Sequence, residues 1–259
     1  MLETRDLTIR FGGHTAVDQV SCRYESGTLT ALVGPNGAGK TTYFNLISGQ
    51  LRANAGSVHL DGRDLTSLGA SARMHAGLGR AFQLTQLFPR LSVHENIRLA
   101  LQSRAQGASW RHIRLWRVWD ADRALLERAD VLLERALLKD RRDQPAASLP
   151  HGDQRKLEIA MLMALSPRVY MLDEPTAGMS VDDMPVMLDL IRELKQDSGK
   201  IILLVEHKMD VVRELADRIV VLHNGRLVAD GRPAEVMASP IVQEAYLGAR
   251  RARKEAAHA

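Results

Sequence analysis

The segment GPNGAGKTT, Gly34 to Thr42, constrains the fold of this 259-residue chain more than any other feature. An apolar run, Leu29 to Val33, precedes it, and a helix-like pattern follows it and ends at Gly49. The segment therefore matches GxxxxGK[ST] in the order strand, loop, helix, which is the context that a phosphate-binding loop requires. That order predicts an α/β fold with a mostly parallel sheet.

Each residue type in this loop suits the binding of a phosphate chain. Glycines let backbone N–H groups wrap the phosphates, and the N-terminus of the next helix adds positive potential. Lys40 can reach the β- and γ-phosphates of a nucleoside triphosphate, and Thr41 offers Mg²⁺ a hydroxyl oxygen. We expect the whole loop to contact the nucleotide: Gly34, Pro35, Asn36, Gly37, Ala38, Gly39, Lys40, Thr41 and Thr42.

Two acids end a later apolar run. The sequence MLDE places Asp173 and Glu174 at the carboxyl end of a strand, where a parallel sheet meets its ligand crevice. We expect Asp173 to hold Mg²⁺, in part through water, and Glu174 to orient or deprotonate the attacking water. The sequence therefore predicts triphosphate hydrolysis, with an acid pair that only caps a turn as the structural alternative.

The apolar pattern predicts strands first, then helices, then an alternation of the two. Between about Leu91 and Leu138 apolar residues recur at helical spacing, in a series that runs to Leu137, which indicates an inserted helical subdomain. Within a single domain, 1–259, we expect a catalytic core lobe at 1–84 and 166–259 and a helical subdomain at 85–165. The expected strands are 7–11, 17–24, 29–33, 169–172, 201–205 and 219–222, and the expected later helices are 183–196 and 209–216.

Composition excludes several classes of protein. Hydrophobic residues make up 45% and charged residues 25% of the chain, which is typical of a soluble globular protein rather than a disordered one. The single cysteine, Cys22, favours a reducing compartment, and apolar runs stay well below the roughly 18 residues of a membrane span. A net charge of +4 is mild, so we expect no nucleic-acid partner.

Further segments, in order along nearly the whole chain, resemble the ATP-binding cassette family. They are RAFQ ending at Gln83, LPHGDQRKLEIA from Leu149 to Ala160, the segment from Glu174 to Ser180, and IILLVEH ending at His207. The resemblance implies a P-loop core with a mostly parallel sheet and antiparallel strands at the N-terminus, and an ATPase that uses ATP and Mg²⁺. It also implies that Gln83 senses Mg²⁺ and the attacking water, and that His207 contacts the γ-phosphate. Taken alone, His207 would be an ordinary partly buried histidine.

The family places an aromatic ring against the adenine, and Phe11 lies 29 residues before Lys40 at the corresponding position. Offset stacking of the two rings would contribute about 0.5–1.5 kcal/mol beyond burial. Without the resemblance, Phe11 would be read as a core residue. With it, we expect Phe11 to bind the nucleotide.

In this family two cassettes enclose two ATP molecules, and the signature segment of one cassette closes over the phosphate loop of the other. The corresponding residues are Leu149, Pro150, His151, Gly152 and Asp153. Proline replaces the usual serine and offers neither a hydroxyl nor an N–H group, histidine replaces the first glycine, and aspartate replaces glutamine. We therefore expect the ATP site closed by this segment to be the weaker of two in a heterodimer, with a homodimer as the alternative.

Within the family, residues 77–101 and 231–248 resemble the ATPase subunits of branched-chain amino acid importers. Urea or short-amide importers and lipopolysaccharide exporters are similar, and a soluble cassette protein without a transport role is a further alternative. The resemblance implies integral membrane permease partners, an extracytoplasmic solute-binding protein that acts indirectly, and a peripheral location on the cytoplasmic face of the inner membrane.

Two segments are candidates for contacts outside the cassette. Residues 87–89 (Leu87, Phe88 and Pro89) follow Gln83 where importers receive their permease, although Leu87 and Phe88 could instead pack in the core. Trp110, Ile113 and Trp116 recur among arginines, as on an interfacial helix that contacts lipid headgroups or a permease. The favoured interpretation is that they pack in the core of the helical subdomain and that the arginines form a solvated face.

Overall fold

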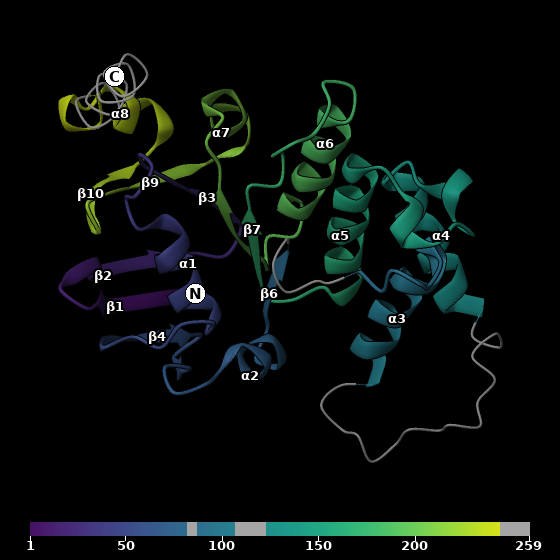
Figure 1. The fold of residues 1–259 in the computed structure, drawn as a ribbon, viewed down its shortest axis with the longest axis horizontal. Coiled ribbons are helices and arrows are strands. Elements are labelled where there is room, and N and C mark those ends of the chain that lie inside the picture. Colours follow the sequence, from purple (N-terminus) through teal and green to yellow (C-terminus); the bar gives the residue numbers. More distant parts are fainter. Residues whose placement is uncertain (82–86, 107–122, 244–259) are drawn as a thin grey trace.

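A computed structural model describes residues 1–81, 87–106 and 123–243 of the chain, which form two sheets and a set of helices (Figure 1). The first half contains β1 (Leu2–Phe11), β2 (His14–Tyr24), β3 (Thr28–Val33), α1 (Lys40–Ser48), β4 (Ala55–Leu60), β5 (Arg63–Asp64), α2 (Ala70–His75), β6 (Leu78–Ala81), α3 (Val93–Gln106) and α4 (Arg123–Arg135). The second half contains two 3₁₀ turns, η3 (Lys139–Arg141) and η4 (Ala146–Ser148), then α5 (His151–Leu165), β7 (Val169–Asp173), α6 (Met184–Lys195), β8 (Ile201–Val205), α7 (Met209–Leu215), β9 (Arg218–His223), β10 (Arg226–Gly231) and α8 (Pro233–Ala238).

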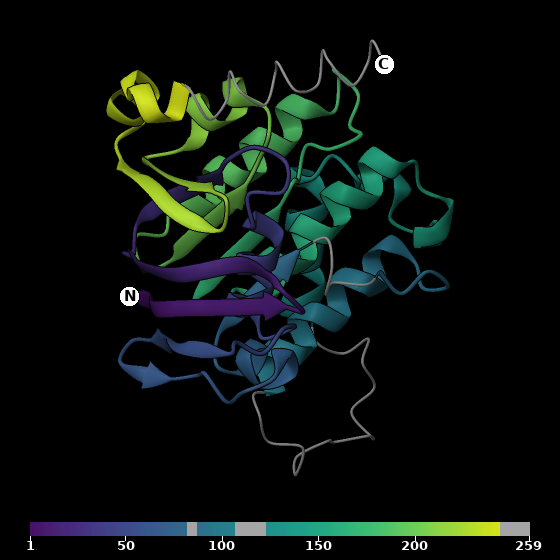
Figure 2. The same cartoon turned by 60° about the vertical axis from the view of Figure 1, so that its left-hand side comes forward.

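The larger sheet has six strands in the order β10-β9-β3-β8-β7-β6, and its neighbours are parallel except for the edge pair of β9 and β10. The smaller sheet is antiparallel, in the order β2-β1-β4-β5, and its long strands lie side by side in Figure 2. The predicted α/β fold, with a mostly parallel sheet and antiparallel N-terminal strands, is confirmed. The β3, β7 and β8 strands carry the apolar runs from which it was predicted.

Those apolar runs are continuous because both faces of the larger sheet are covered. In β8, Ile202 and Leu204 pack into the core that includes the helices α3 to α6. Ile201, Leu203 and Val205 point to the opposite face and pack with α1 and the smaller sheet. The carboxyl ends of these strands therefore emerge between two packed layers, where the loops after β3, β7 and β8 lie.

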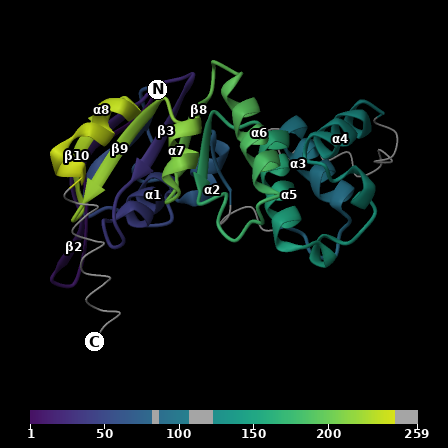
Figure 3. The same cartoon turned by 90° about the horizontal axis from the view of Figure 1, so that it is seen from above.

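Helices α3, α4 and α5 gather at one end of the molecule, opposite the smaller sheet, and α6 stands between them and the larger sheet (Figures 1 and 3). The packing of α3 against α5 and α4 is supported by buried residues such as Ile97, Leu133 and Leu157. The helical series predicted to run to Leu137 ends earlier, since α4 stops at Arg135. Leu137 has a left-handed backbone, with φ of 53°, and is 66% exposed, so its inclusion in the helical series was wrong.

Among the described residues, no helix is both long enough and apolar enough to cross a bilayer.

Candidate active site

The phosphate loop joins β3 to α1, and its backbone needs glycine at specific positions. Gly34 has φ of 151°, and a Cβ there would lie 2.1 Å from the carbonyl oxygen of Leu222. Gly39 has φ of 94°, and its Cβ would lie 2.4 Å from the carbonyl oxygen of Ala16. Both positions therefore exclude a side chain, because the loop is pressed between β2 and the end of β9.

Lys40 is the first residue of α1 and is only 5% exposed. Its Nζ donates hydrogen bonds to the carbonyl oxygens of Gly34, at 2.8 Å, and Pro35, at 2.9 Å. Burial lowers the pKa of the ammonium group, while the charges of Glu174 and Asp173 raise it. Burial is the larger effect, so the net shift of the Lys40 pKa is downward.

The N-terminus of α1 is open to a ligand. Its N-cap is Gly39, which provides no side-chain acceptor, so the first N–H groups of the helix have no cap of that kind. Thr41 and the loop residues Asn36 and Gly37 are exposed, and a Cβ on Gly37 would meet nothing within 4 Å. A triphosphate fits these residues, because exposed backbone donors and a buried cation surround the same loop.

Asp173, at the end of β7, is paired with Arg80, a residue to which the sequence motifs assigned no role. Its Oδ2 accepts a hydrogen bond of 2.6 Å from Nη2 of Arg80, whose side chain is 1% exposed. Arg80 also donates to Asn45, Ser48 and Gln50, at 2.6, 3.0 and 2.8 Å. The arginine therefore connects the acid to the C-terminal end of α1.

The donor set at this strand end fits Mg²⁺. Carboxylate and hydroxyl oxygens are the protein ligands that this ion prefers, and Asp173 and Thr41 supply one of each beside the phosphate loop. The third predicted ligand, Gln83, lies outside the described residues, as do Trp110, Ile113 and Trp116.

Glu174 follows Asp173 and has an unusual backbone, with φ of 51°. Its Oε1 accepts a hydrogen bond of 2.7 Å from Nε2 of His207, and both side chains are roughly two-fifths exposed. The sheet brings the two together, because β7 and β8 are parallel neighbours and the N–H of Glu174 donates to the carbonyl oxygen of Val205. A carboxylate and an imidazole at the ends of two neighbouring strands are suited to handling a proton.

The other predicted nucleotide contact, Phe11, ends β1 and is 50% exposed. Phe11 therefore does not belong to the core, and its ring is accessible.

Leu87 packs against the helical core, whereas Phe88 is 49% exposed. The buried side chain of Asn96 fixes this loop through bonds to the backbone N–H and carbonyl groups of Phe88.

The signature segment forms the start of α5, after the buried Leu149. Pro150 is the N-cap and is exposed, as is His151. A Cβ on Gly152 would lie 2.5 Å from Oδ2 of Asp183, so a side chain there would require the Asp183 carboxylate to shift. Asp153 is 7% exposed and turns inward.

An ion-pair cluster holds Asp153 inside the chain. Its carboxylate lies 2.5 Å from Nζ of Lys156 and 3.1 Å from Nη1 of Arg141. Lys156 in turn contacts Asp183, at 3.1 Å, in the segment that leads to α6. Burial lowers the pKa of Lys156, but its bonds to the two aspartates raise it further, so the net shift is upward. The start of α5 is thus tied to the chain that follows Glu174.

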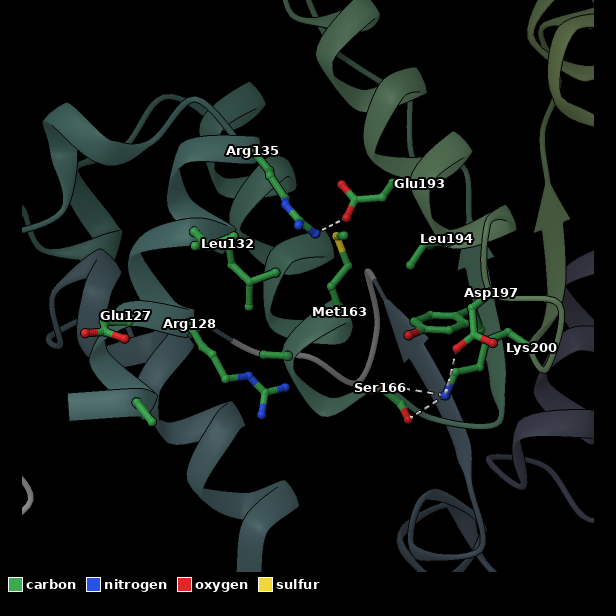
Figure 4. Close-up of a pocket in the computed structure, with 14 residues that line it drawn as sticks. Glu127, Arg128, Leu132, Arg135, Met163, Ser166, Glu193, Leu194, Asp197 and Lys200 are labelled. Atoms are coloured by element: carbon green, nitrogen blue, oxygen red, sulfur yellow. Dashed lines mark hydrogen bonds and ion pairs between the residues drawn. The ribbon is translucent and has the colours of Figure 1, made fainter. Parts of the chain in front are cut away.

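A cavity of about 590 Å³ lies away from these residues, between α4, the end of α5 and α6 (Figure 4). Arg135 and Glu193 face each other across it as an ion pair, and Lys200 donates to Ser166. None of the predicted site residues lines this cavity.

Sequence patterns missed two buried charged residues near the site, Arg80 and Glu206. Arg80 interrupts the apolar strand β6, and a charge at such a position indicates a buried partner. Glu206 follows the apolar run of β8 directly, so the strand-end reasoning applied to Asp173 would also have identified it.

The loop, the lysine inside it and the strand-end acids define a P-loop nucleoside triphosphatase. The family model described as "ABC transporter" matches residues 17–177, and the model described as "Branched-chain amino acid ATP-binding cassette transporter" matches residues 226–252. The chain therefore belongs to the ABC transporter family, as its motifs predicted.

Individual relatives cover nearly the whole chain. The branched-chain amino acid transport ATP-binding protein LivG of Salmonella typhimurium is 36% identical, over 96% of this chain and 98% of its own length. The lipopolysaccharide export ATP-binding protein LptB of Escherichia coli is 33% identical, over 95% and 97%. The ADP conformation of MJ1267, an ATP-binding cassette of an ABC transporter, is a solved structure with a TM-score of 0.79 and 30% identity, over 96% and 98%.

The chain is thus an ABC transporter ATPase that binds ATP. An ATPase of this class works as a pair of cassettes together with membrane permease subunits, so the site described above is one part of a larger assembly.

Proposed function

We propose that this chain is the ATPase subunit of an importer of branched-chain amino acids or of a related small polar solute. The observation that carries the solute class is the match of residues 226–252 to the branched-chain cassette model. The similarity to LivG over nearly the full length supports the same class.

In this proposal the nucleotide binds across the phosphate loop. The exposed ring of Phe11 stacks on the adenine, while the loop N–H groups and Lys40 bind the phosphates. Thr41 and Asp173, together with Gln83, hold the Mg²⁺ ion, which neutralises phosphate charge when it is bound. Arg80 keeps the Asp173 carboxylate in place through their 2.6 Å ion pair.

Hydrolysis depends on the pair of Glu174 and His207. Glu174 orients the attacking water and accepts its proton at a carboxylate oxygen. His207 lies 2.7 Å from that carboxylate, holds it in position, and contacts the γ-phosphate with its exposed imidazole. The family resemblance assigns Gln83 the further role of coupling this site to the helical part of the chain.

The partners in this proposal are a permease, a second cassette and, indirectly, an extracytoplasmic solute-binding protein. The exposed ring of Phe88, on a loop fixed by Asn96, is the proposed permease contact. The chain is then peripheral to the inner membrane, on its cytoplasmic face. A heterodimer is favoured, because Pro150 lacks the donors of a serine and Asp153 is occupied by Lys156 and Arg141.

Export is the second candidate function, and the similarity to LptB favours it. The direction of transport is a property of the permease, so both candidates share the same ATPase chemistry.

Solute uptake by the native host tests the proposal. The chromosomal gene is replaced by the Glu174→Gln variant, by the control variant Glu127→Gln on the exposed face of α4, or by the wild-type sequence. We expect uptake of radiolabelled leucine to be lost only with Glu174→Gln. Loss of urea uptake with normal leucine uptake would instead indicate an amide importer, and normal uptake of both solutes would contradict an import role for either class.

A further inference from the structure

We infer that Glu206 is a positioning residue that aligns the carboxylate of Glu174 with the imidazole of His207, by joining the loop after β7 to the loop after β8. The inference rests on the proposed roles of Glu174 and His207. In the proposed mechanism, Glu206 itself contacts neither the attacking water nor the nucleotide.

Glu206 is buried, at 3% exposure, directly after the last residue of β8. Its Oε1 accepts two hydrogen bonds from Thr176, one from the backbone N–H at 3.3 Å and one from the hydroxyl. Its Oε2 accepts two from its own loop, from the N–H groups of His207, at 2.7 Å, and Lys208, at 3.1 Å. Each carboxylate oxygen therefore serves a different loop.

These bonds close a ring. Thr176 lies two residues after Glu174, and His207 follows Glu206 directly, so the two loops meet again where the His207 imidazole contacts Glu174 at 2.7 Å. Lys208 adds a second connection, because its Nζ donates to the carbonyl oxygen of Thr176 at 3.2 Å. A displacement of either loop would have to break bonds to Glu206.

The chemistry explains why a carboxylate is needed at this position. All four hydrogen-bond partners named above are donors, and a carboxylate is acceptor-only, with room for two donors on each oxygen. A glutamine at the same position has one acceptor oxygen and one NH₂ group, and the NH₂ group cannot accept from a backbone N–H on either side. Glu206→Gln therefore keeps the size of the side chain but loses the bond from at least one backbone N–H, that of Thr176 or those of His207 and Lys208, whichever way the amide is turned.

The test measures ATP hydrolysis by the assembled transporter purified from membranes, with the variant in this chain. Glu206→Gln is expected to lower kcat by on the order of tenfold. The dissociation constant of ATP should change less than kcat, since of the residues that Glu206 contacts only His207 is proposed to reach the nucleotide and none belongs to the phosphate loop. An unchanged kcat in folded Glu206→Gln protein would overturn the inference.

A double-mutant cycle separates positioning from a merely structural role. If Glu206 acts through His207, Glu206→Gln should cause little further loss of kcat in protein that already carries His207→Ala. Losses that multiply in the double variant would show that Glu206 acts independently of His207, against the inference.

Two variants of the partner residue guard against misfolding of Glu206→Gln. Thr176→Val has the same shape but lacks the hydroxyl donor, and Thr176→Ser retains it. We expect the valine variant to lose turnover and the serine variant to keep it, at similar melting temperatures.

If His207→Ala and Glu174→Gln both hydrolyse ATP normally, the proposed site is wrong. That outcome differs from a failure of Glu206→Gln alone, which would overturn only the positioning role.

Discussion

At the scale of single residues, the three carboxylates around the two strand ends differ in what surrounds them. Asp173 is paired with the buried guanidinium of Arg80. The buried Glu206 accepts hydrogen bonds from uncharged groups, namely backbone N–H groups and the hydroxyl of Thr176. Glu174 is partly exposed and meets the imidazole of His207. Of the three, Glu174 is the carboxylate that solvent can reach, which suits a base that must exchange protons with water.

The first prediction concerns that base. Glu174→Gln should retain ATP binding and lose turnover, because the amide keeps the size of the side chain but cannot accept a proton. Equilibrium binding of a fluorescent ATP analogue and release of phosphate measure the two properties. Wild-type-like turnover would remove Glu174 from its proposed role.

The second prediction concerns Arg80. Arg80→Met leaves the buried Asp173 without its cation, so the free energy of unfolding should fall by about 3 kcal/mol or more. ATP hydrolysis per folded molecule should also fall, by on the order of tenfold, because Asp173 loses its fixed orientation. Urea denaturation and phosphate release measure the two effects.

Arg73 provides a matched control for Arg80. It is also buried, at 3% exposure, and it packs against the end of the same helix, but its bonds go to carbonyl oxygens such as those of Leu46 and Ile47. Arg73→Met should therefore lower stability without reducing hydrolysis per folded molecule. Equal losses of hydrolysis in the two variants would mean that the contact with Asp173 has no special role.

At the scale of elements, the geometry of the phosphate loop depends on what packs behind it. The strand β9 supplies the carbonyl oxygen of Leu222 against Gly34, and β2 supplies that of Ala16 against Gly39. Gly34→Ala should weaken ATP binding at least about tenfold, because the Cβ forces the loop away from its backing strands. Gly13→Ala, in the open turn after β1, is the control and should bind normally; equal affinities in a fluorescence titration would contradict the expectation.

The helix α5 carries a titratable group that makes stability depend on pH. Burial raises the pKa of Glu158 from 4.5 to about 7, and the charge of Arg155 offsets only part of this effect. Because the folded pKa lies above the unfolded one, folding favours the protonated form of Glu158. Below pH 4.5 Glu158 is protonated in both states and costs the fold nothing. The free energy of unfolding then falls as the pH rises from 4.5 through about 7, because the buried carboxyl must ionise.

Glu158→Gln should therefore raise the free energy of unfolding at pH 8, by up to about 3 kcal/mol, and leave it nearly unchanged near pH 4.5. Denaturant titrations at the two pH values measure the difference. The exposed Glu127→Gln on α4 is the control and should change neither value; a Glu158 variant with no pH-dependent gain would contradict the prediction.

At the scale of the whole molecule, the helical end and the sheets are joined close to the signature segment. Lys156 in α5 bonds to Asp183, beyond the loop that carries Glu174, and Arg141 holds Asp153 from the other side. The first residues of α5 are therefore placed by contacts within this chain. Pro150 and His151 are the exposed signature residues that a second cassette would meet.

The last prediction tests the asymmetric pair. Pro150→Ser should restore a hydroxyl and an N–H donor toward the partner's ATP, each worth on the order of 1.5–3 kcal/mol when charge-assisted, and should raise hydrolysis by the assembled complex. Steady-state phosphate release by the membrane-extracted complex measures it. Unchanged hydrolysis would sink the idea that this signature closes the weaker site.

The α/β order, the phosphate loop, the strand-end acids and the family could all be predicted from the sequence, because each depends on neighbouring residues in the chain. A loop motif between an apolar run and a helix, or an acid at the end of such a run, is a local signal. The end of α4 could not be predicted in this way. The apolar spacing continues to Leu137, although the backbone of that residue is left-handed and no longer helical.

The residues that support the site could be identified only in the folded chain. Arg80 meets Asp173 across 93 positions of sequence, and Glu206 meets Thr176 across 30. Asp153 stands where the family has a glutamine that faces a partner, yet an ion pair with Lys156 turns it inward. These contacts depend on which strands become neighbours and on the need of each buried charge for a partner. Neither can be predicted from a single segment of the chain, because the partners lie far apart in sequence.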